Sequence, residues 1–171
     1  VAGHDLLLDL VDHAVQLVNA GATVIDVGGE STRPGAERLD VDKEQARVIP
    51  VIRELVARDV PVSIDTMNAA TAAAAIDLGA VLVNDVSGGL ADKNMPRLIA
   101  ESGIEYVAMH WRGHSANMNS LAVYTDVVRD VRNELALGLL AGLDACHHGV
   151  ENPRQFLDLL WATYLHGFCL G

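Results

Sequence analysis

Cysteine, aromatic residues and basic charge are all scarce in this chain of 171 residues. Two cysteines are too few for a disulfide framework and suit a reducing compartment, so we expect a cytoplasmic protein. The net charge of −11 repels phosphate backbones, which argues against a nucleic-acid partner. No apolar run approaches the roughly 20 residues that cross a bilayer, which argues against a membrane partner. Half of the residues are apolar and only 4% are aromatic, which predicts one domain with an aliphatic core.

Common cofactor motifs are also missing from the chain. It contains no GxGxxG dinucleotide fingerprint and no phosphate loop of the GxxxxGKS or GxxxxGKT type. Five residues of metal-ligand type gather towards the C-terminus, and their spacing fits no standard zinc site: Cys146, His147, His148, His166 and Cys169. We interpret this cluster as accidental and assign no metal ligands.

Helical patterns alternate with short β-branched runs along the sequence. The spacing of apolar residues predicts helices and strands in turn over residues 5–20, 22–27, 40–58, 60–64, 68–78, 80–84, 95–101, 104–109 and 125–140. This alternation predicts a parallel sheet with right-handed crossovers. Pro50 falls inside the second helix, where we expect a kink or two helical pieces because proline removes a backbone bond.

A polar residue closes each of the four predicted strands: Asp26, Asp65, Asn84 and His110. Polar side chains at the carboxyl ends of parallel strands are typical of the mouth of a (β/α)₈ barrel. Such a barrel needs about 250 residues, so we predict a partial TIM barrel with about four to five parallel βα units. Residues 1–144 form the predicted barrel domain, and 145–171 form a divergent tail with a candidate helix over 154–164. A histidine at a strand end is usually a hydrogen-bonded structural residue, so His110 receives no functional role.

The loop after the first predicted strand is rich in glycine and carries polar groups suited to anions. Residues 26–36 read DVGGESTRPGA, and the paired glycines let the backbone turn sharply and approach a ligand closely. Arg33 offers a fork of donors that suits phosphate or carboxylate, and Thr32 offers a hydroxyl. Pro34 and Gly35 are expected to stiffen and close the turn.

This loop and three later segments resemble, in the same order, the motifs of the dihydropteroate synthase family, which has a pterin-binding TIM barrel. The later segments are SIDT at 63–66, VNDVSGG at 83–89 and AMHW at 108–111. The resemblance runs from about residue 6 to about residue 135 and does not extend to the tail. The family's first loop and its last three βα units have no counterpart, so the resemblance implies a barrel that is incomplete at both ends.

The resemblance implies a transferase of folate biosynthesis. Such an enzyme condenses 6-hydroxymethyl-7,8-dihydropterin diphosphate with p-aminobenzoate and releases 7,8-dihydropteroate and diphosphate. It also implies Mg²⁺ on the leaving diphosphate, inhibition by sulfonamides that mimic p-aminobenzoate, and a homodimer when the protein is intact. Folate-dependent methyltransferase domains resemble the same family, so such a domain or a non-catalytic pterin-binding module is the alternative. The STRPGA sequence favours the synthase, because in the family this loop serves p-aminobenzoate.

By resemblance, Asp65 and Asn84 bind the pterin. A pterin ring carries a 2-amino group and a ring N–H as donors, and a buried carboxylate is a natural acceptor for both. The alternatives are that Asp65 caps the following helix and that Asn84 is a satisfied amide bracing the barrel. Asp85 should point to the opposite face of its strand and is interpreted as structural or as a support for the site.

The remaining candidates also take their roles from the family. Asp26 lies in the cavity by resemblance, and the alternative is a carboxylate that accepts N–H bonds from Gly28 and Gly29. The loop 32–34 is implied to shape the p-aminobenzoate pocket and meet the diphosphate, and Met109 to contact the pterin through its polarizable sulfur. No catalytic residue is assigned. The predicted substrate-binding set is Asp26, Thr32, Arg33, Pro34, Asp65, Asn84 and Met109.

Overall fold

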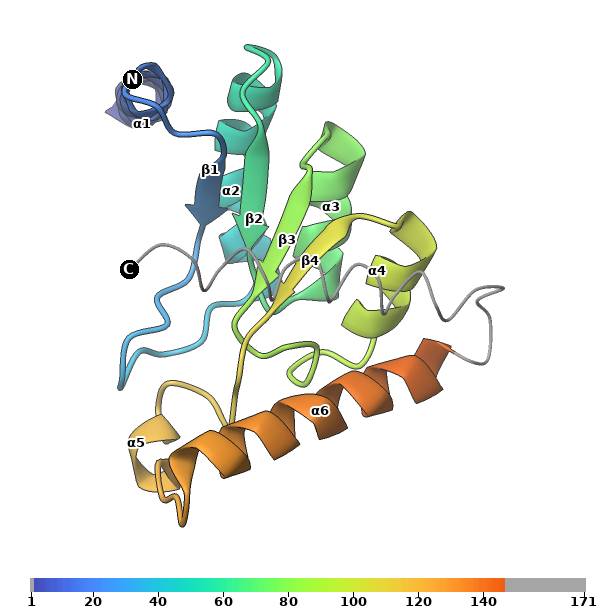
Figure 1. Ribbon diagram of the computed structural model, residues 1–171. Coiled ribbons are helices and arrows are strands. Elements are labelled where there is room, and N and C mark those ends of the chain that lie inside the picture. Colours follow the sequence, from blue (N-terminus) through green and yellow to red (C-terminus); the bar gives the residue numbers. More distant parts are fainter. Residues whose placement is uncertain (1, 147–171) are drawn as a thin grey trace.

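The computed structural model describes residues 2–146 and has helices and strands in alternation (Figure 1). In chain order the elements are α1 (Ala2–Asn19), β1 (Ile25–Gly28), α2 (Val41–Val56), β2 (Val62–Asp65), α3 (Ala69–Leu78), β3 (Leu82–Asp85), α4 (Met95–Ser102), β4 (Glu105–Ala108), α5 (Met118–Leu121) and α6 (Val127–Cys146). The expected helix over 154–164 lies outside the described residues.

The strands form one parallel sheet in the order β1-β2-β3-β4. Consecutive strands are neighbours, and each is joined to the next by a helix, as in successive units of a (β/α)₈ barrel. The prediction of a partial barrel with about four to five parallel βα units is therefore confirmed for the described part of the chain, which has four. All four strands point the same way (Figure 1), so their carboxyl ends lie at one edge of the sheet.

Proline at position 50 does not divide the second helix. Residues Val41–Val56 form a single α-helix with Pro50 inside it, so of the two expected outcomes the division into two helical pieces is wrong, and the kink stays a prediction. The strong N-terminal cap is one physical reason, because Asp40 accepts a hydrogen bond from Asp42 N at 3.0 Å. The apolar stripe of the helix is another reason, because Ile52 and Leu55, which follow Pro50 in the helix, are completely buried. Packing of this stripe offsets the backbone hydrogen bond that proline removes.

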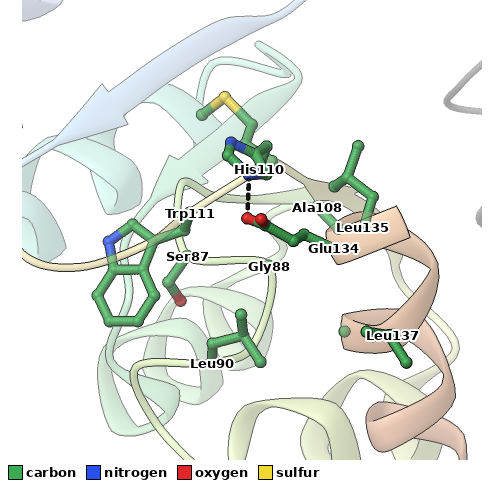
Figure 2. A pocket seen from close by; sticks show the side chains of 11 residues that line it. Ser87, Gly88, Leu90, Ala108, His110, Trp111, Glu134, Leu135 and Leu137 are labelled. Carbon is green, nitrogen blue, oxygen red and sulfur yellow. Dashed lines mark hydrogen bonds and ion pairs between the residues drawn. The ribbon is translucent and has the colours of Figure 1, made fainter. Parts of the chain in front are cut away.

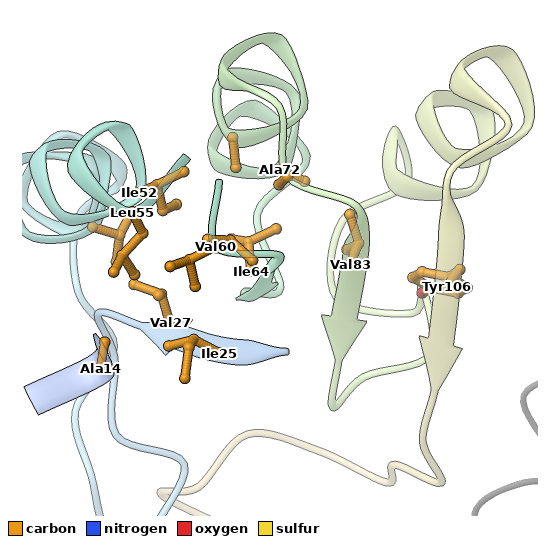
Figure 3. Close-up of a cluster of buried hydrophobic side chains, with 14 of the residues drawn as sticks. Ala14, Ile25, Val27, Ile52, Leu55, Val60, Ile64, Ala72, Val83 and Tyr106 are labelled. Carbon is orange, nitrogen blue, oxygen red and sulfur yellow. The ribbon is translucent and has the colours of Figure 1, made fainter. Parts of the chain in front are cut away.

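The hydrophobic core lies between the sheet and its helices (Figure 3). Alternate strand residues such as Val27, Ile64 and Val83 point to the helices and are almost completely buried. Ala72 and Ala75 of α3 are fully buried as well, and their small side chains let this helix approach the sheet closely. The scarcity of aromatic residues therefore reflects a thin aliphatic layer between sheet and helices.

A buried carboxylate fixes the loop after β3. Asp85 has no exposed surface and accepts hydrogen bonds from Ser87 N, Ser87 Oγ and Gly89 N at 2.7–2.8 Å. The hydroxyl of Tyr106 on β4 donates a fourth, at 2.8 Å. Burial, followed by the Asp85 charge, raises the pKa of Tyr106, so the phenol stays a donor. The structural role expected of Asp85 is confirmed.

We predict that Asp85→Ala lowers the free energy of unfolding by about 3 kcal/mol, because it leaves several buried donors without an acceptor. Urea unfolding followed by circular dichroism measures the change. Glu101→Gln is the matched control, since Glu101 forms an exposed ion pair with Arg97 on α4 and its loss should cost less than about 0.5 kcal/mol. Equal effects of the two substitutions would contradict this account of the loop.

Candidate functional site at the carboxyl ends of the strands

Three predicted site residues share one face of the sheet. In the parallel register, Gly28 of β1 is opposite Asp65 of β2, which is opposite Asn84 of β3. Asp26 lies two residues before Gly28 on the same face. The alternate residues of these strands face the helices and form the core. This face is therefore polar near the carboxyl ends, and Asp26, Asp65 and Asn84 lie together on it.

Asn84 and Asp26 bond to each other across β2. Asn84 Nδ2 donates to Asp26 Oδ2 at 3.1 Å, although the two strands are not neighbours. Within residues 2–146 Asp26 accepts no hydrogen bond from the backbone of Gly28 or Gly29, so that alternative is wrong. Beside Asp26 in the register is Ser63, which is 2% exposed and whose hydroxyl has no hydrogen-bond partner in the structure.

Asp65 is the most perturbed acid of this face. Burial, then the nearby charge of Asp26, raises its pKa from 3.8 to about 6. In the described part of the chain its carboxylate makes no hydrogen bond or ion pair, so the alternative role, a cap on α3, is not formed. A partly buried acceptor without donors is typical of a binding site, because a ligand with N–H groups can supply them.

The paired glycines serve close packing within the protein. Neither Gly28 nor Gly29 has a positive φ, so neither is required for a sharp turn. A Cβ on Gly28 would lie 3.2 Å from Asp65 Oδ2, and a Cβ on Gly29 would lie 3.0 Å from Val48 of α2. The first glycine therefore leaves room for the Asp65 carboxylate, and the second brings the loop against α2.

The segment 33–36 forms a tight turn in an exposed loop. Ala36 N donates to Arg33 O at 3.0 Å, Pro34 occupies the second position, and Gly35 has φ of 82°. These features define a type II turn, which needs a positive φ at its third residue. The turn predicted from proline and glycine is confirmed. Thr32 and the Arg33 guanidinium are exposed and make no side-chain hydrogen bond or ion pair with the described residues, so both are free to meet a ligand.

Met109 directly follows β4 at the same edge of the sheet. It lines a cavity of about 290 Å³ between the loop after β3, the end of β4 and α6 (Figure 2). His110 and Glu134 line the same cavity, whereas Asp26, Asp65 and Asn84 do not. His110 Nε2 lies 2.8 Å from Glu134 Oε2, as expected for a structural histidine. Met109 and the three polar residues thus do not line one cavity. Asn84 is nevertheless opposite Val107, two residues before Met109, and a contact of Met109 with the pterin stays a prediction.

An ion-pair cluster fixes α6 against the end of β4. Glu134 binds Arg112 through both carboxylate oxygens, at 2.8 and 2.5 Å. Arg112 also donates to two backbone carbonyls and lies 4.0 Å from the centre of the Tyr124 ring. The hydrogen bonds from Arg112 and His110 lower the pKa of Glu134 to about 2, so this carboxylate remains charged at neutral pH.

A second buried carboxylate braces the loop after β2, and the sequence analysis missed it. Glu44 of α2 is 1% exposed and accepts hydrogen bonds from Thr66 Oγ1, Asn68 Nδ2 and Thr71 Oγ1 at 2.7–2.8 Å. The sequence does contain a pattern that could have predicted this burial, because Glu44 falls in the apolar stripe of its helix, four residues before Val48. An acid in that stripe must have buried partners.

Residues 2–146 contain no candidate metal-ligand group and no candidate membrane span. No group of three or more histidine, cysteine or acidic side chains in this range could hold a metal ion. None of the helices there is long and apolar enough to span a bilayer.

Four parallel βα units with a polar, partly unsatisfied candidate site at the strand ends define part of a barrel of the (β/α)₈ class. The model of the family described as "Pterin binding enzyme" matches residues 4–163. The chain therefore belongs to the pterin-binding enzyme family. The match extends beyond residue 144, and the division of the chain at that position stays a prediction.

Individual proteins that resemble this chain are dihydropteroate synthases. The chain is 51% identical over 152 residues to a dihydropteroate synthase of Mycobacterium leprae, which covers 88% of this chain and 52% of the relative. It resembles the structure of the Xanthomonas albilineans dihydropteroate synthase with 4-aminobenzoic acid, with a TM-score of 0.74 and 35% identity. The match covers 87% of this chain and 51% of that structure. It also resembles the structure of the Burkholderia cenocepacia dihydropteroate synthase complexed with 7,8-dihydropteroate. The TM-score is 0.71 and the identity 38%, and the match covers 86% of this chain and 52% of that structure. The chain spans about half the length of these relatives.

We predict that Asp65→Asn stabilises the ligand-free protein by about 1 kcal/mol at pH 7.5, after allowance for the partial exposure of Asp65. The raised pKa means that the folded state disfavours the ionised carboxylate. This penalty is complete above pH 6, decreases as the pH falls, and vanishes below the ordinary value of 3.8.

Urea unfolding of both proteins between pH 3.5 and 7.5 tests the linkage. The difference in unfolding free energy should shrink steadily with decreasing pH. A difference that is constant with pH would show that the gain comes from something other than ionisation of Asp65.

Proposed function

We propose that this chain forms the pterin-binding half of a dihydropteroate synthase active site. The observation that carries the proposal is the pair of unsatisfied acceptors on one sheet face, the Asp65 carboxylate and Asn84 Oδ1. A pterin presents a 2-amino group and a ring N–H along one edge, and these donors match carboxylate and amide acceptors. The family membership and the identity to synthases support the same ligand.

In the proposed reaction, the amine of p-aminobenzoate attacks the methylene carbon of 6-hydroxymethyl-7,8-dihydropterin diphosphate. The new C–N bond replaces the C–O bond, diphosphate leaves with the bonding electrons, and the amine loses one proton. Asp65 and Asn84 orient the pterin, and the negative charge of Asp65 and Asp26 favours the positive charge that develops on the ring. Much of the rate enhancement then comes from holding two substrates together.

The exposed turn supplies the second half of the proposed site. Arg33 and Thr32 are free to bind the carboxylate of p-aminobenzoate or the leaving diphosphate, and Pro34 fixes their backbone. Mg²⁺ is part of the proposal as a partner of the diphosphate. The described residues hold no cluster that fits a metal ion, so we assign it no ligand and route no step through it. A contact of Met109 with the pterin, a cytoplasmic location, a homodimer and the absence of a nucleic-acid partner stay predictions.

Asp65→Ala should weaken binding of the pterin diphosphate at least about 100-fold, because two charge-assisted hydrogen bonds are lost. Isothermal titration calorimetry measures the dissociation constant. Asp77→Ala is the matched control, since Asp77 lies exposed on the adjacent helix α3. An unchanged affinity of the Asp65 variant would remove this residue from the site.

Release of diphosphate on addition of p-aminobenzoate tests the activity itself. The proposal predicts turnover in the unmodified protein and competition by a sulfonamide. Binding of the pterin without any release of diphosphate would favour the alternative, a non-catalytic pterin-binding module. Absence of pterin binding would overturn both functions.

A further inference from the structure

The side chain of Arg38 lies where three loops at the mouth of the barrel meet. Its Nε pairs with Glu30 of its own loop at 3.2 Å. One terminal nitrogen donates to Asn68 Oδ1 of the loop after β2 at 2.9 Å, and the other lies 3.3 Å from His114 Nδ1 of the loop after β4. Two-thirds of the Arg38 side chain is covered, although it belongs to an exposed loop.

Two of these mouth loops also touch through their backbones. Gly35 N donates to Ser115 O at 2.8 Å. Gly35 belongs to the turn that presents Arg33, so this bond and the contact between Arg38 and His114 hold the turn on both sides. The loop between β1 and α2 is thereby attached to the loop between β4 and α5.

Asn68 provides a fixed anchor for Arg38. It is 8% exposed, its Nδ2 donates to Glu44 Oε2 at 2.7 Å, and its backbone N–H donates to Thr66 Oγ1 at 3.0 Å. Thr66 in turn donates to Glu44 and directly follows Asp65. Arg38 therefore connects an exposed loop to the buried residues beneath the proposed pterin site.

We propose that Arg38 is a positioning residue that holds the turn 33–36 over the mouth, so that Thr32 and Arg33 meet p-aminobenzoate. This inference rests on the proposed function for the identity of the ligand. Arg38 makes no contact with Asp26, Asp65 or Asn84, so it is not a catalytic residue. Its planar fork makes three contacts in different directions, which a lysine cannot reproduce.

Loss of Arg38 has a specific consequence for Glu30. The Glu30 side chain is only 9% exposed, and its ion pair within the described residues is the one with Arg38. A covered carboxylate without a partner is costly, and the loop can relieve that cost by moving outward until Glu30 is hydrated. Removal of Arg38 should thus open this loop while the bonds of Asn68 to Glu44 and Thr66 keep the pterin side intact.

The test compares Arg38→Met and Arg38→Lys with the unmodified protein. Both variants should bind p-aminobenzoate more weakly in the presence of saturating pterin diphosphate. We expect about a tenfold loss in Arg38→Met, since no charge-assisted contact then fixes the loop, and a smaller loss in Arg38→Lys, whose ammonium can still pair with Glu30. Their affinity for pterin diphosphate should be unchanged. Arg97→Met is the control, because Arg97 is an exposed arginine whose ion-pair partner among the described residues is Glu101 on α4. Calorimetry measures both dissociation constants.

A second readout needs no ligand. A glutamate-specific protease should cleave after Glu30 and Glu37 faster in both Arg38 variants, and at the unmodified rate in Arg97→Met. Trp111 packs edge-on against His114 at 5.0 Å between ring centres, so its emission should shift to the red when the loop opens. Circular dichroism must give the same helix content for all proteins, which separates loop opening from unfolding.

The outcomes separate this inference from the proposed function. Unchanged cleavage and unchanged p-aminobenzoate affinity in Arg38→Met would overturn the role of Arg38. Equal weakening of both ligands would also overturn it, because a general loss of structure would then explain the result. If the unmodified protein binds neither ligand, the proposed function fails, and faster cleavage would still support Arg38 as the residue that holds the loop.

Discussion

The parallel register of β1, β2 and β3 is the constraint on which the site depends. It sets Gly28, Asp65 and Asn84 at one level of the sheet, with the side chains of Asp65 and Asn84 on the face opposite the helices. A shift of one residue would turn Asp65 into the core and expose Ile64. The absence of a side chain on Gly28 is part of the same constraint, because it leaves the space that the Asp65 carboxylate occupies. Packing of the aliphatic core therefore decides where the acceptors of the site lie.

Buried carboxylates fix the loops that surround this face. Asp85 organises the loop after β3, and Glu44 organises the loop after β2. Both are saturated with donors, whereas the partly buried Asp65 has none among the described residues, and its pKa is raised to about 6. The protein thus satisfies the acids that support its loops and leaves unsatisfied the acid that faces the mouth. This contrast is the physical basis for assigning Asp65 to a ligand.

The order of elements and the polar strand ends could be predicted from the sequence, because they follow from local periodicity and from the rule that barrel sites lie at carboxyl ends. The common face of Asp65 and Asn84 followed from the same reasoning. The continuity of α2 through Pro50 could not be predicted from the sequence, since tertiary packing of the apolar stripe of α2 outweighs the local effect of proline. The contacts of Arg38 could not be predicted either, because they join residues that are 30 and 76 positions apart in the sequence through side chains on irregular loops.

Titration of the Asp65 carboxyl carbon by ¹³C NMR, with and without bound pterin diphosphate, tests the central claim most directly. Without ligand the account predicts a pKa of about 6. Donors from the pterin would stabilise the charged form, so the bound complex should titrate at a clearly lower pH. A pKa that stays near 6 after the pterin has bound would contradict the claim that Asp65 accepts its hydrogen bonds.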